Sequence, residues 1–196
     1  MIFLIIRHGN TDWNMIQRLQ GREDIPLNAA GIEQAHVCGR ALSGIRAEVI
    51  LTSPLSRASK MAEILSFYTG SRIVTEPDLT ERDYGVLSGK TPEGRDIFNP
   101  GEDTEGLEPL DEVSRRFLGV LRRYGTMGYG IIPVVSHGGS INAVLREITH
   151  GETGTGKIRI HNGGISIVSF SDGQFTVIKE NIRPEEFGEY RQLAER

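Results

Sequence analysis

The feature of this sequence that most restricts its fold is the alternation of short apolar runs with longer stretches of helical periodicity. The apolar runs are brief and rich in β-branched residues, which is typical of parallel strands covered on both faces. They cover residues 2–6, 47–52, 72–76 and 131–136. Pro133 limits the hydrogen bonding of the last run on one side.

Helical periodicity fills the gaps between these runs, at residues 29–43, 54–68, 111–124 and 139–149. Ser53 and Pro54 suit the N-cap and first position of the second helix. Further along, two alternating runs flank Ser171-Asp172-Gly173 and predict a β-hairpin over residues 164–180. The whole pattern predicts an α/β fold, a three-layer sandwich with a mainly parallel central sheet and helices on both faces.

Length and composition indicate one soluble domain spanning residues 1–196, because 196 residues with 38% hydrophobic content suffice for one core. The net charge of -4 argues against a general nucleic-acid binder. A single cysteine, Cys38, excludes an internal disulfide and a cysteine-based zinc site. We find no signal peptide and no apolar run long enough for a membrane helix, so we expect a cytoplasmic protein that binds no membrane.

Chemically capable residues follow the predicted strands. His8 follows the first, Arg57 lies in the first helical turn after the second, and Glu81 comes a few residues beyond the third. His137 directly follows the fourth strand. Ligands bind beyond the carboxyl ends of the strands in such sheets, so we expect these residues to meet at one edge.

This set suits the cleavage of a phosphate monoester. Arg7 and Arg57 can neutralise the dianion and hold its oxygens. A neutral His8 imidazole can attack phosphorus, and His137 can donate to a phosphoryl oxygen. Glu81, protonated beside the dianion, can supply the leaving alkoxide with a proton and later take one from water. The scheme needs no metal or cofactor, and the five histidines show no zinc-protease spacing.

Glycines lie where we expect the backbone to approach the ligand. Gly9 follows His8, and Gly138-Gly139 follow His137. The helix that begins near residue 139 is expected to point its amides at an anion.

Five segments, in order, resemble the motifs of the histidine phosphatase superfamily, which includes cofactor-dependent phosphoglycerate mutases and many small phosphatases. The resemblance spans nearly the whole chain. The segments are Arg7-His8-Gly9-Asn10-Thr11 followed by Trp13-Asn14, Gly21 with Asp24-Ile25-Pro26-Leu27-Asn28 and Gly31, Thr52-Ser53-Pro54-Leu55-Ser56-Arg57-Ala58, Leu79-Thr80-Glu81-Arg82-Asp83-Tyr84-Gly85, and Val135-Ser136-His137-Gly138-Gly139.

The resemblance implies a phosphoglycerate mutase-like fold and a role for each motif residue. His8 would be phosphorylated during turnover, Arg7, Arg57 and His137 would complete the phosphate pocket, and Glu81 would be the proton donor. Further substrate contacts would come from Asn14, Gln20, Gly21, Arg82, Tyr84 and Gly138. The roles of Asp83, a rival acid, and of His161 stay open.

The sequence departs from the family at two places, and the second of them favours the small phosphatase branch. Asn10 stands where many members have glutamate. The lid-like insertion at about 90–110 is short and acidic, and Arg115-Arg116 comes too late to replace the mutases' arginine pair. We therefore expect a phosphomonoesterase acting on a small phosphorylated metabolite. A phosphoglycerate mutase, which is an isomerase, is one alternative, a non-catalytic phosphate-ligand binding module is another, and homodimer formation stays open.

Other patterns receive simpler interpretations. The segment 151–157 has the glycine and lysine spacing of a phosphate-binding P-loop, but Ile158 stands where serine or threonine must bind magnesium. We interpret the segment as a flexible connection. Trp13 is interpreted as a packing residue, and Arg115-Arg116 and Arg122-Arg123 as solvated helix faces.

Overall fold

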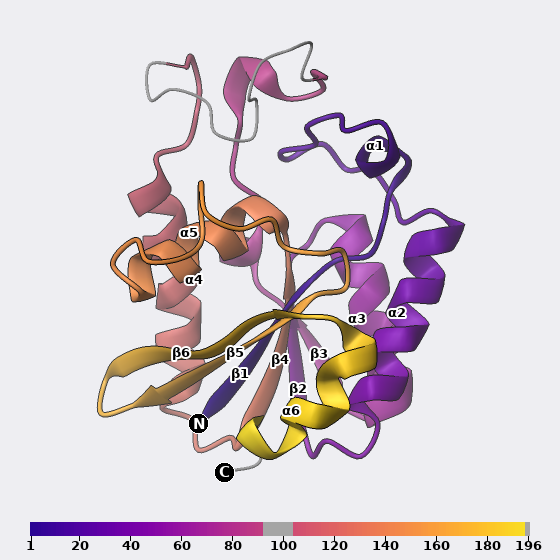
Figure 1. Cartoon of the computed structure of the whole chain (residues 1–196), viewed down its shortest axis with the longest axis vertical. Coiled ribbons are helices and arrows are strands. Elements are labelled where there is room, and N and C mark those ends of the chain that lie inside the picture. The colour runs from indigo at the N-terminus through magenta and orange to yellow at the C-terminus, as the bar shows by residue number, and fades with distance from the viewer. Residues whose placement is uncertain (92–103, 195–196) are drawn as a thin grey trace.

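A six-stranded sheet runs through the computed structural model, which describes residues 1–91 and 104–194 (Figure 1). The strands lie in the order β3-β2-β4-β1-β5-β6. Their bounds are Ile2–Arg7 (β1), Val49–Thr52 (β2), Arg72–Thr75 (β3), Ile131–Ser136 (β4), Ile165–Ser171 (β5) and Gln174–Ile182 (β6). The first four strands pair in parallel, and the predicted hairpin forms an antiparallel edge. The predicted α/β fold with a mainly parallel sheet is confirmed.

Helices cover both faces of the sheet (Figure 1). On one face lie α2 (Ala29–Leu42), α3 (Ser56–Thr69) and α6 (Phe187–Ala194), and on the other α4 (Leu110–Gly125) and α5 (Gly138–Ile148). Side chains of β1 alternate between the two resulting cores, with Leu4 in the first and Phe3 and Ile5 in the second. This double burial explains why the strands are apolar throughout. The sequence did not predict α6 or the short α1 (Asp12–Met15).

The start of α3 differs from the prediction. The helix begins at Ser56, and its N-cap position is Leu55, which makes no capping hydrogen bond through its side chain. The Ser56 amide donates instead to Asp24 Oδ1 at 2.7 Å. Ser53 and Pro54 therefore precede the helix, and the capping acceptor comes from a loop 32 residues away, where local spacing could not reveal it.

The carboxyl ends of the parallel strands point toward α1 and the start of α5, at the upper end of Figure 1. Most of the expected lid, residues 92–103, lies outside the described residues. Within residues 1–91 and 104–194, no helix is both long and apolar enough to cross a membrane.

Candidate active site

A cavity of about 390 Å³ opens at this edge of the sheet. Nearly all of the predicted site residues line it, although they come from five separate segments. They are Arg7, His8, Asn14, Gln20, Gly21, Arg57, Glu81, Arg82, Tyr84 and Gly138. The strand-end argument therefore predicted correctly that these residues lie close together, except for His137, which is described below.

The neighbouring Gly9 carbonyl fixes the tautomer of the His8 ring. Its ring Nδ1 lies 2.7 Å from the Gly9 carbonyl oxygen, which can only accept a hydrogen bond. Nδ1 therefore carries the hydrogen, and Nε2 keeps its lone pair. Burial, followed by the positive charges of Arg57 and Arg7, holds the pKa of His8 well below its usual range, so the ring is neutral at neutral pH.

Gly9 serves packing and not ligand approach, contrary to the sequence-based expectation. A Cβ on Gly9 would overlap the Gly31 carbonyl in the first turn of α2. The loop after β1 thus lies directly against this helix end. The glycines of two family-like motifs, Gly9 and Gly31, are required by the same close approach.

Arg7, which is partly buried, and Arg57, which is fully buried, bring two cations with neutral partners to the cavity. Arg7 Nη1 donates to the Ile160 carbonyl at 2.5 Å, and Arg57 donates to the carbonyls of Gly21 and Glu23 at 2.8 and 2.6 Å. Within the described part of the chain, neither forms an ion pair. Burial lowers both pKa values to about 10, so both stay charged at neutral pH. Buried cations without counter-ions favour an anionic ligand.

His137 lies behind the cavity wall. Its ring centre is 5.1 Å from that of His8, and the residue is fully buried. Nδ1 accepts a hydrogen bond from Arg57 Nε at 3.2 Å, and Nε2 lies 2.7 Å from Ser53 Oγ. In this structure the two ring nitrogens of His137 contact Arg57 and Ser53, and its predicted hydrogen bond to a phosphoryl oxygen stays a prediction.

Glu81 is the one carboxylate among the described residues that line the cavity. Its oxygens accept from the amides of Arg82, Gly139 and Ser140 at 2.8, 3.1 and 2.8 Å, and from Ser140 Oγ at 3.1 Å. The amides at the start of α5 were predicted to point at an anion, and the group that they contact is the carboxyl of Glu81. A Cβ on Gly139 would overlap the Tyr84 hydroxyl and lie 2.8 Å from Glu81 Oε1. The glycine is what lets the carboxylate approach the helix end.

Arg116 fixes the acid-bearing loop from behind, so the interpretation of this residue as part of a solvated face is wrong. Its guanidinium donates to the carbonyls of Asp78, Thr80 and Glu81 at 2.6, 2.7 and 3.2 Å. It also forms an ion pair with Glu108 at 2.8 Å, with the Arg116 side chain only 15% exposed. The helical periodicity could not reveal this role, because the three carbonyls lie 35 to 38 residues earlier in the chain.

The predicted substrate contacts occupy distinct parts of the cavity wall. Asn14 Oδ1 accepts from the Thr11 amide and hydroxyl at 3.0 and 3.1 Å, which leaves its NH₂ group as the part able to donate to a ligand. Gln20 is buried, with an unpartnered side-chain oxygen in the described structure. Gly21 lines the cavity, and its carbonyl oxygen accepts a hydrogen bond from Arg57.

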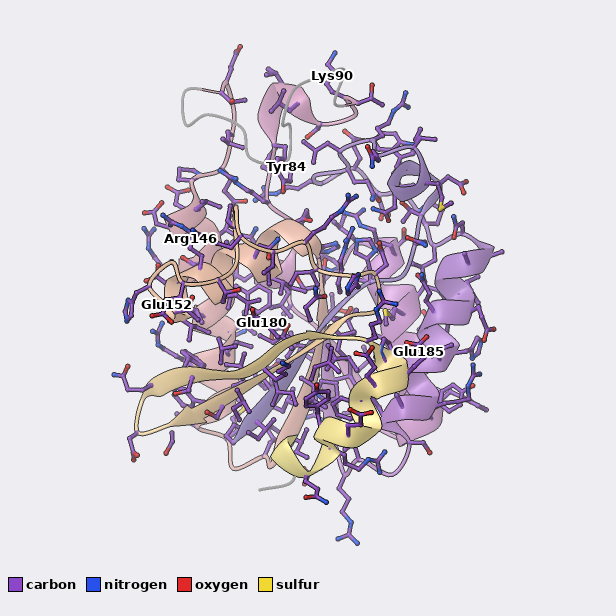
Figure 2. The ribbon with its side chains drawn as sticks, viewed as in Figure 1. Tyr84, Lys90, Arg146, Glu152, Glu180 and Glu185 are labelled. Atoms are coloured by element: carbon purple, nitrogen blue, oxygen red, sulfur yellow. The ribbon has the colours of Figure 1, made fainter. Side chains whose placement is uncertain are left out.

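Arg82 and Tyr84 pack against each other on the acid-bearing loop. The Arg82 guanidinium lies 5.6 Å from the Tyr84 ring centre, and its Nε donates to the Glu108 carbonyl at 2.7 Å. Tyr84, labelled in Figure 2, lies below the loop that carries Lys90. Burial, aided by the charge of Glu81, raises the pKa of Tyr84, which keeps its hydroxyl protonated. The rival acid Asp83 does not line the cavity and pairs with Arg22 at 3.8 Å.

One part of the wall was missed by sequence reasoning. Thr155, Gly156, Lys157, Ile158, Arg159 and Ile160 line the cavity. The interpretation of this region as a flexible connection is wrong, because the Thr155 amide donates to the Asn142 carbonyl and the Asn142 side chain donates to the Ile158 carbonyl, at 3.2 and 3.3 Å. The glycine and lysine spacing was the available signal.

Two residues with open roles lie elsewhere. Asn10 and His161 line a second, smaller cavity of about 270 Å³. Asn10 donates through its amide to Gln34 Oε1 at 2.8 Å. In the described ranges, no group of three or more histidine, cysteine, aspartate or glutamate side chains is placed to hold a metal ion.

Comparison with known proteins agrees with this geometry. A family model described as the histidine phosphatase superfamily (branch 1) matches residues 3–183. The chain is 36% identical over 179 residues to the uncharacterized phosphatase PhoE of Bacillus subtilis (strain 168), covering 91% of this chain and 93% of the relative. It is 31% identical over 187 residues to the probable phosphoglycerate mutase GpmB of Yersinia pestis (strain Pestoides F), covering 86% and 84%.

A solved structure of similar fold is the phosphoserine phosphatase of Entamoeba histolytica in complex with 3-phosphoglyceric acid. It is 27% identical, has a TM-score of 0.79, and the match covers 92% of this chain and 96% of that one. With the family model matching nearly the whole chain and its motif residues meeting at one cavity, this protein belongs to branch 1 of the histidine phosphatase superfamily.

Proposed function

We propose that this protein hydrolyses a phosphate monoester of a small metabolite through a phosphohistidine formed on His8. The observation that carries the proposal is the hydrogen bond between Nδ1–H of His8 and the Gly9 carbonyl. It leaves the Nε2 lone pair of a neutral ring in the cavity that Arg7 and Arg57 also line. Such a nucleophile attacks a phosphate dianion without adding negative charge.

In the first half-reaction, Arg7 and Arg57 hold the phosphoryl oxygens and Asn14 donates through its NH₂ group. The Nε2 lone pair forms a bond to phosphorus as the bond between phosphorus and the ester oxygen breaks. The leaving oxygen takes a proton from Glu81. The amides of Arg82, Gly139 and Ser140 and the Ser140 hydroxyl hold the Glu81 carboxyl in place, and the second half-reaction returns the proton that Glu81 gives up here.

In the second half-reaction, the Glu81 carboxylate takes a proton from a water molecule. The water oxygen bonds to phosphorus as the bond from phosphorus to Nε2 breaks. Inorganic phosphate leaves, and the electron pair returns to His8. One carboxyl group thus serves as acid and then as base.

Hydrolysis is favoured over the mutase reaction by the position of the arginine pair on α4. Arg116 is bound to backbone carbonyls of the acid-bearing loop, and Arg115 is exposed and pairs with Asp111. Neither lines the cavity, so neither is placed to hold the far end of phosphoglycerate there. The relative from Bacillus subtilis, which is named a phosphatase, supports the same choice.

The test is turnover by the metal-free protein with 4-nitrophenyl phosphate and, separately, with 3-phosphoglycerate. Free phosphate and 2-phosphoglycerate are both measured, with and without a bisphosphate primer. We expect free phosphate without primer, lost in His8→Ala and kept in His36→Ala, whose histidine contacts Tyr68 outside the cavity. Primer-dependent 2-phosphoglycerate with little free phosphate would establish the mutase instead. Failure of a folded protein to make either product would favour the non-catalytic binding module.

A further inference from the structure

Asn162, which the proposed chemistry does not use, contacts two residues of the phosphate pocket. Its side-chain Nδ2 donates to the His8 carbonyl at 3.1 Å and to Asn14 Oδ1 at 3.4 Å. An amide NH₂ group has two hydrogens, so each of the two acceptors can take one. Asn162 lines the second, smaller cavity and not the main one, so any effect it has on the reaction passes through His8 and Asn14.

The backbone determines which way both side-chain amides face. The Thr11 amide, which can only donate, lies 3.0 Å from the Asn14 side chain, so the atom that it meets is the oxygen. The His8 carbonyl can only accept, so the atom of Asn162 that it meets is the nitrogen. Asn14 Oδ1 thus accepts from Thr11 and Asn162, and the NH₂ group of Asn14 is left for the cavity that the residue lines.

The hydrogen bond to the His8 carbonyl bears on the reacting ring. That carbonyl belongs to the planar peptide that joins His8 to Gly9, and the next carbonyl, that of Gly9, accepts from His8 Nδ1. On the other side of the residue, the His8 amide donates to the Ser136 carbonyl at 3.0 Å. Asn162 therefore holds the peptide between the nucleophile and the acceptor that fixes its tautomer. Rotation of this peptide would carry the Gly9 carbonyl away from Nδ1.

Asn162 is itself held in a tight turn. The Gly164 amide donates to the His161 carbonyl at 2.9 Å, and Gly163 has a φ of +77°, which glycine adopts without strain. The turn is also bonded to the end of β1, because the Gly163 amide donates to the Arg7 carbonyl at 3.0 Å and the Arg7 amide donates to the Gly164 carbonyl at 3.1 Å. The turn thus has a fixed position relative to the strand that precedes the nucleophile.

We propose that Asn162 is a positioning residue for phosphoryl transfer. Its NH₂ group fixes the peptide between His8 and Gly9, and with it the ring tautomer, and it holds the Asn14 side chain with its own NH₂ group toward the phosphate. The inference rests on the proposed function for the reaction that is served, but the positions themselves can be observed without turnover. The property that matters is hydrogen-bond donation, because a side chain of similar size without an NH₂ group would hold neither acceptor.

Substitutions that keep the size of the side chain and remove its donors test this role. Asn162→Leu is uncharged, and Asn162→Asp keeps the preference of asparagine for turns. We expect kcat/KM for 4-nitrophenyl phosphate to fall at least about tenfold in both, because a small displacement of the reacting groups costs that much. His161→Ala is the matched control, since it removes the neighbouring side chain of the same turn and the same second cavity, and it should keep full activity. A variant of Asn162 that keeps full activity, or an equal fall in the control, would overturn the proposal.

The tautomer of His8 gives a readout that a loss of stability alone would not change. In protein labelled with ¹⁵N-histidine, the signals of His8 are assigned by their absence in His8→Ala. We expect the unchanged protein and His161→Ala to show a protonated Nδ1 and a bare Nε2. In Asn162→Leu, or in Asn162→Asp if the first variant does not fold, the two ¹⁵N shifts should move toward each other as the ring exchanges between tautomers. Separate shifts that persist in a folded Asn162 variant would refute the assignment.

A double-mutant cycle tests the contact with Asn14. Because Asn162 is proposed to act in part through Asn14, Asn162→Leu should lower kcat/KM by a smaller factor in Asn14→Ala than in the unchanged enzyme. Equal factors in the two backgrounds would refute the part of the proposal that involves Asn14.

The two readouts separate this proposal from the proposed function. Loss of the fixed tautomer in Asn162→Leu, but not in His161→Ala, would support the positioning of His8 even if the protein hydrolysed no phosphomonoester. If the unchanged protein hydrolyses 4-nitrophenyl phosphate, and Asn162→Leu keeps both the tautomer and kcat/KM, the positioning role is overturned and the proposed function stays intact.

Discussion

Replacing Arg116 by alanine tests whether this side chain, outside the cavity, holds the acid-bearing loop in place. The guanidinium bonds to three backbone carbonyls and to the Glu108 carboxylate. Its side chain is 15% exposed and that of Glu108 is 10% exposed. Alanine would leave a largely buried carboxylate and three carbonyls without this donor. Removing one partner of a buried ion pair costs about 3 to 5 kcal/mol, and partial access to water places this case near 3 kcal/mol.

Arg115→Ala is the matched control on the same helix. Its ion pair with Asp111 joins side chains that are 69% and 70% exposed, so its loss should cost less than about 0.5 kcal/mol. Urea unfolding measures both variants. With a slope of about 3 kcal/mol per molar urea, Arg116→Ala should lower the midpoint by about 1 M. Because Glu81 shares the loop, kcat for 4-nitrophenyl phosphate should also fall by about tenfold or more.

The loss of stability in Arg116→Ala should become smaller as the pH falls. Burial alone would raise the pKa of Glu108, but hydrogen bonds from Arg116 and the Asp83 amide and the nearby charges of Arg116 and Arg22 outweigh it and lower that pKa. A lowered pKa stabilises the fold above the unfolded value of about 4.3, and this stabilisation is lost as the pH falls below it. The stability gap between the unchanged protein and Arg116→Ala should therefore narrow in acid. If Arg116→Ala proved as stable as Arg115→Ala at neutral pH, the reasoning would be refuted.

Three further predictions follow from the contacts around the two histidines and Glu81. Ser53→Ala removes the partner of His137 Nε2 and should lower kcat/KM for 4-nitrophenyl phosphate by about tenfold, whereas Ser53→Thr, which keeps a hydroxyl, should restore part of it. Gly139→Ala places a methyl group against the Tyr84 hydroxyl and Glu81 and should lower kcat by about 100-fold. Adding Tyr84→Phe removes the overlap with the hydroxyl and should recover part of the lost activity. His8 and His137 both have pKa values held well below their usual range, so the unfolded chain binds their protons first as the pH falls below about 6.5. The free energy of unfolding should then fall by up to about 1.4 kcal/mol per pH unit for each histidine. Urea unfolding at several pH values measures this fall, and an equal dependence on pH in His8→Gln and in the unchanged protein would contradict the reasoning.

Local periodicity was sufficient to predict the framework of the fold. The runs at residues 2–6 and 131–136 became neighbouring central strands, and the turn at Asp172-Gly173 joins the predicted hairpin. These predictions succeeded because a strand buried on both faces must be apolar at every position, and a tight turn needs residues that accept positive φ. The order of the strands and the helix α6 required contacts that no local pattern reports.

The sequence also determined which reactive residues would meet. His8 and Arg57 each follow a parallel strand, and the carboxyl ends of parallel strands share one edge. Glu81 was placed there with the help of its family-like loop, and the cavity contains it. Chain order and strand direction are enough for this kind of proximity.

Only the tertiary structure decided what each of these groups contacts. Glu81 accepts from amides 58 and 59 residues away, Arg116 donates to carbonyls 35 to 38 residues earlier, and Arg7 reaches Ile160 across 153 residues. Periodicity reports whether a side chain is buried, whereas the identity of its partner depends on which distant backbone groups the packed layers bring within about 3 Å. The residue types were thus set by the sequence, and their orientation and hydrogen-bond partners were set by the closure of the fold.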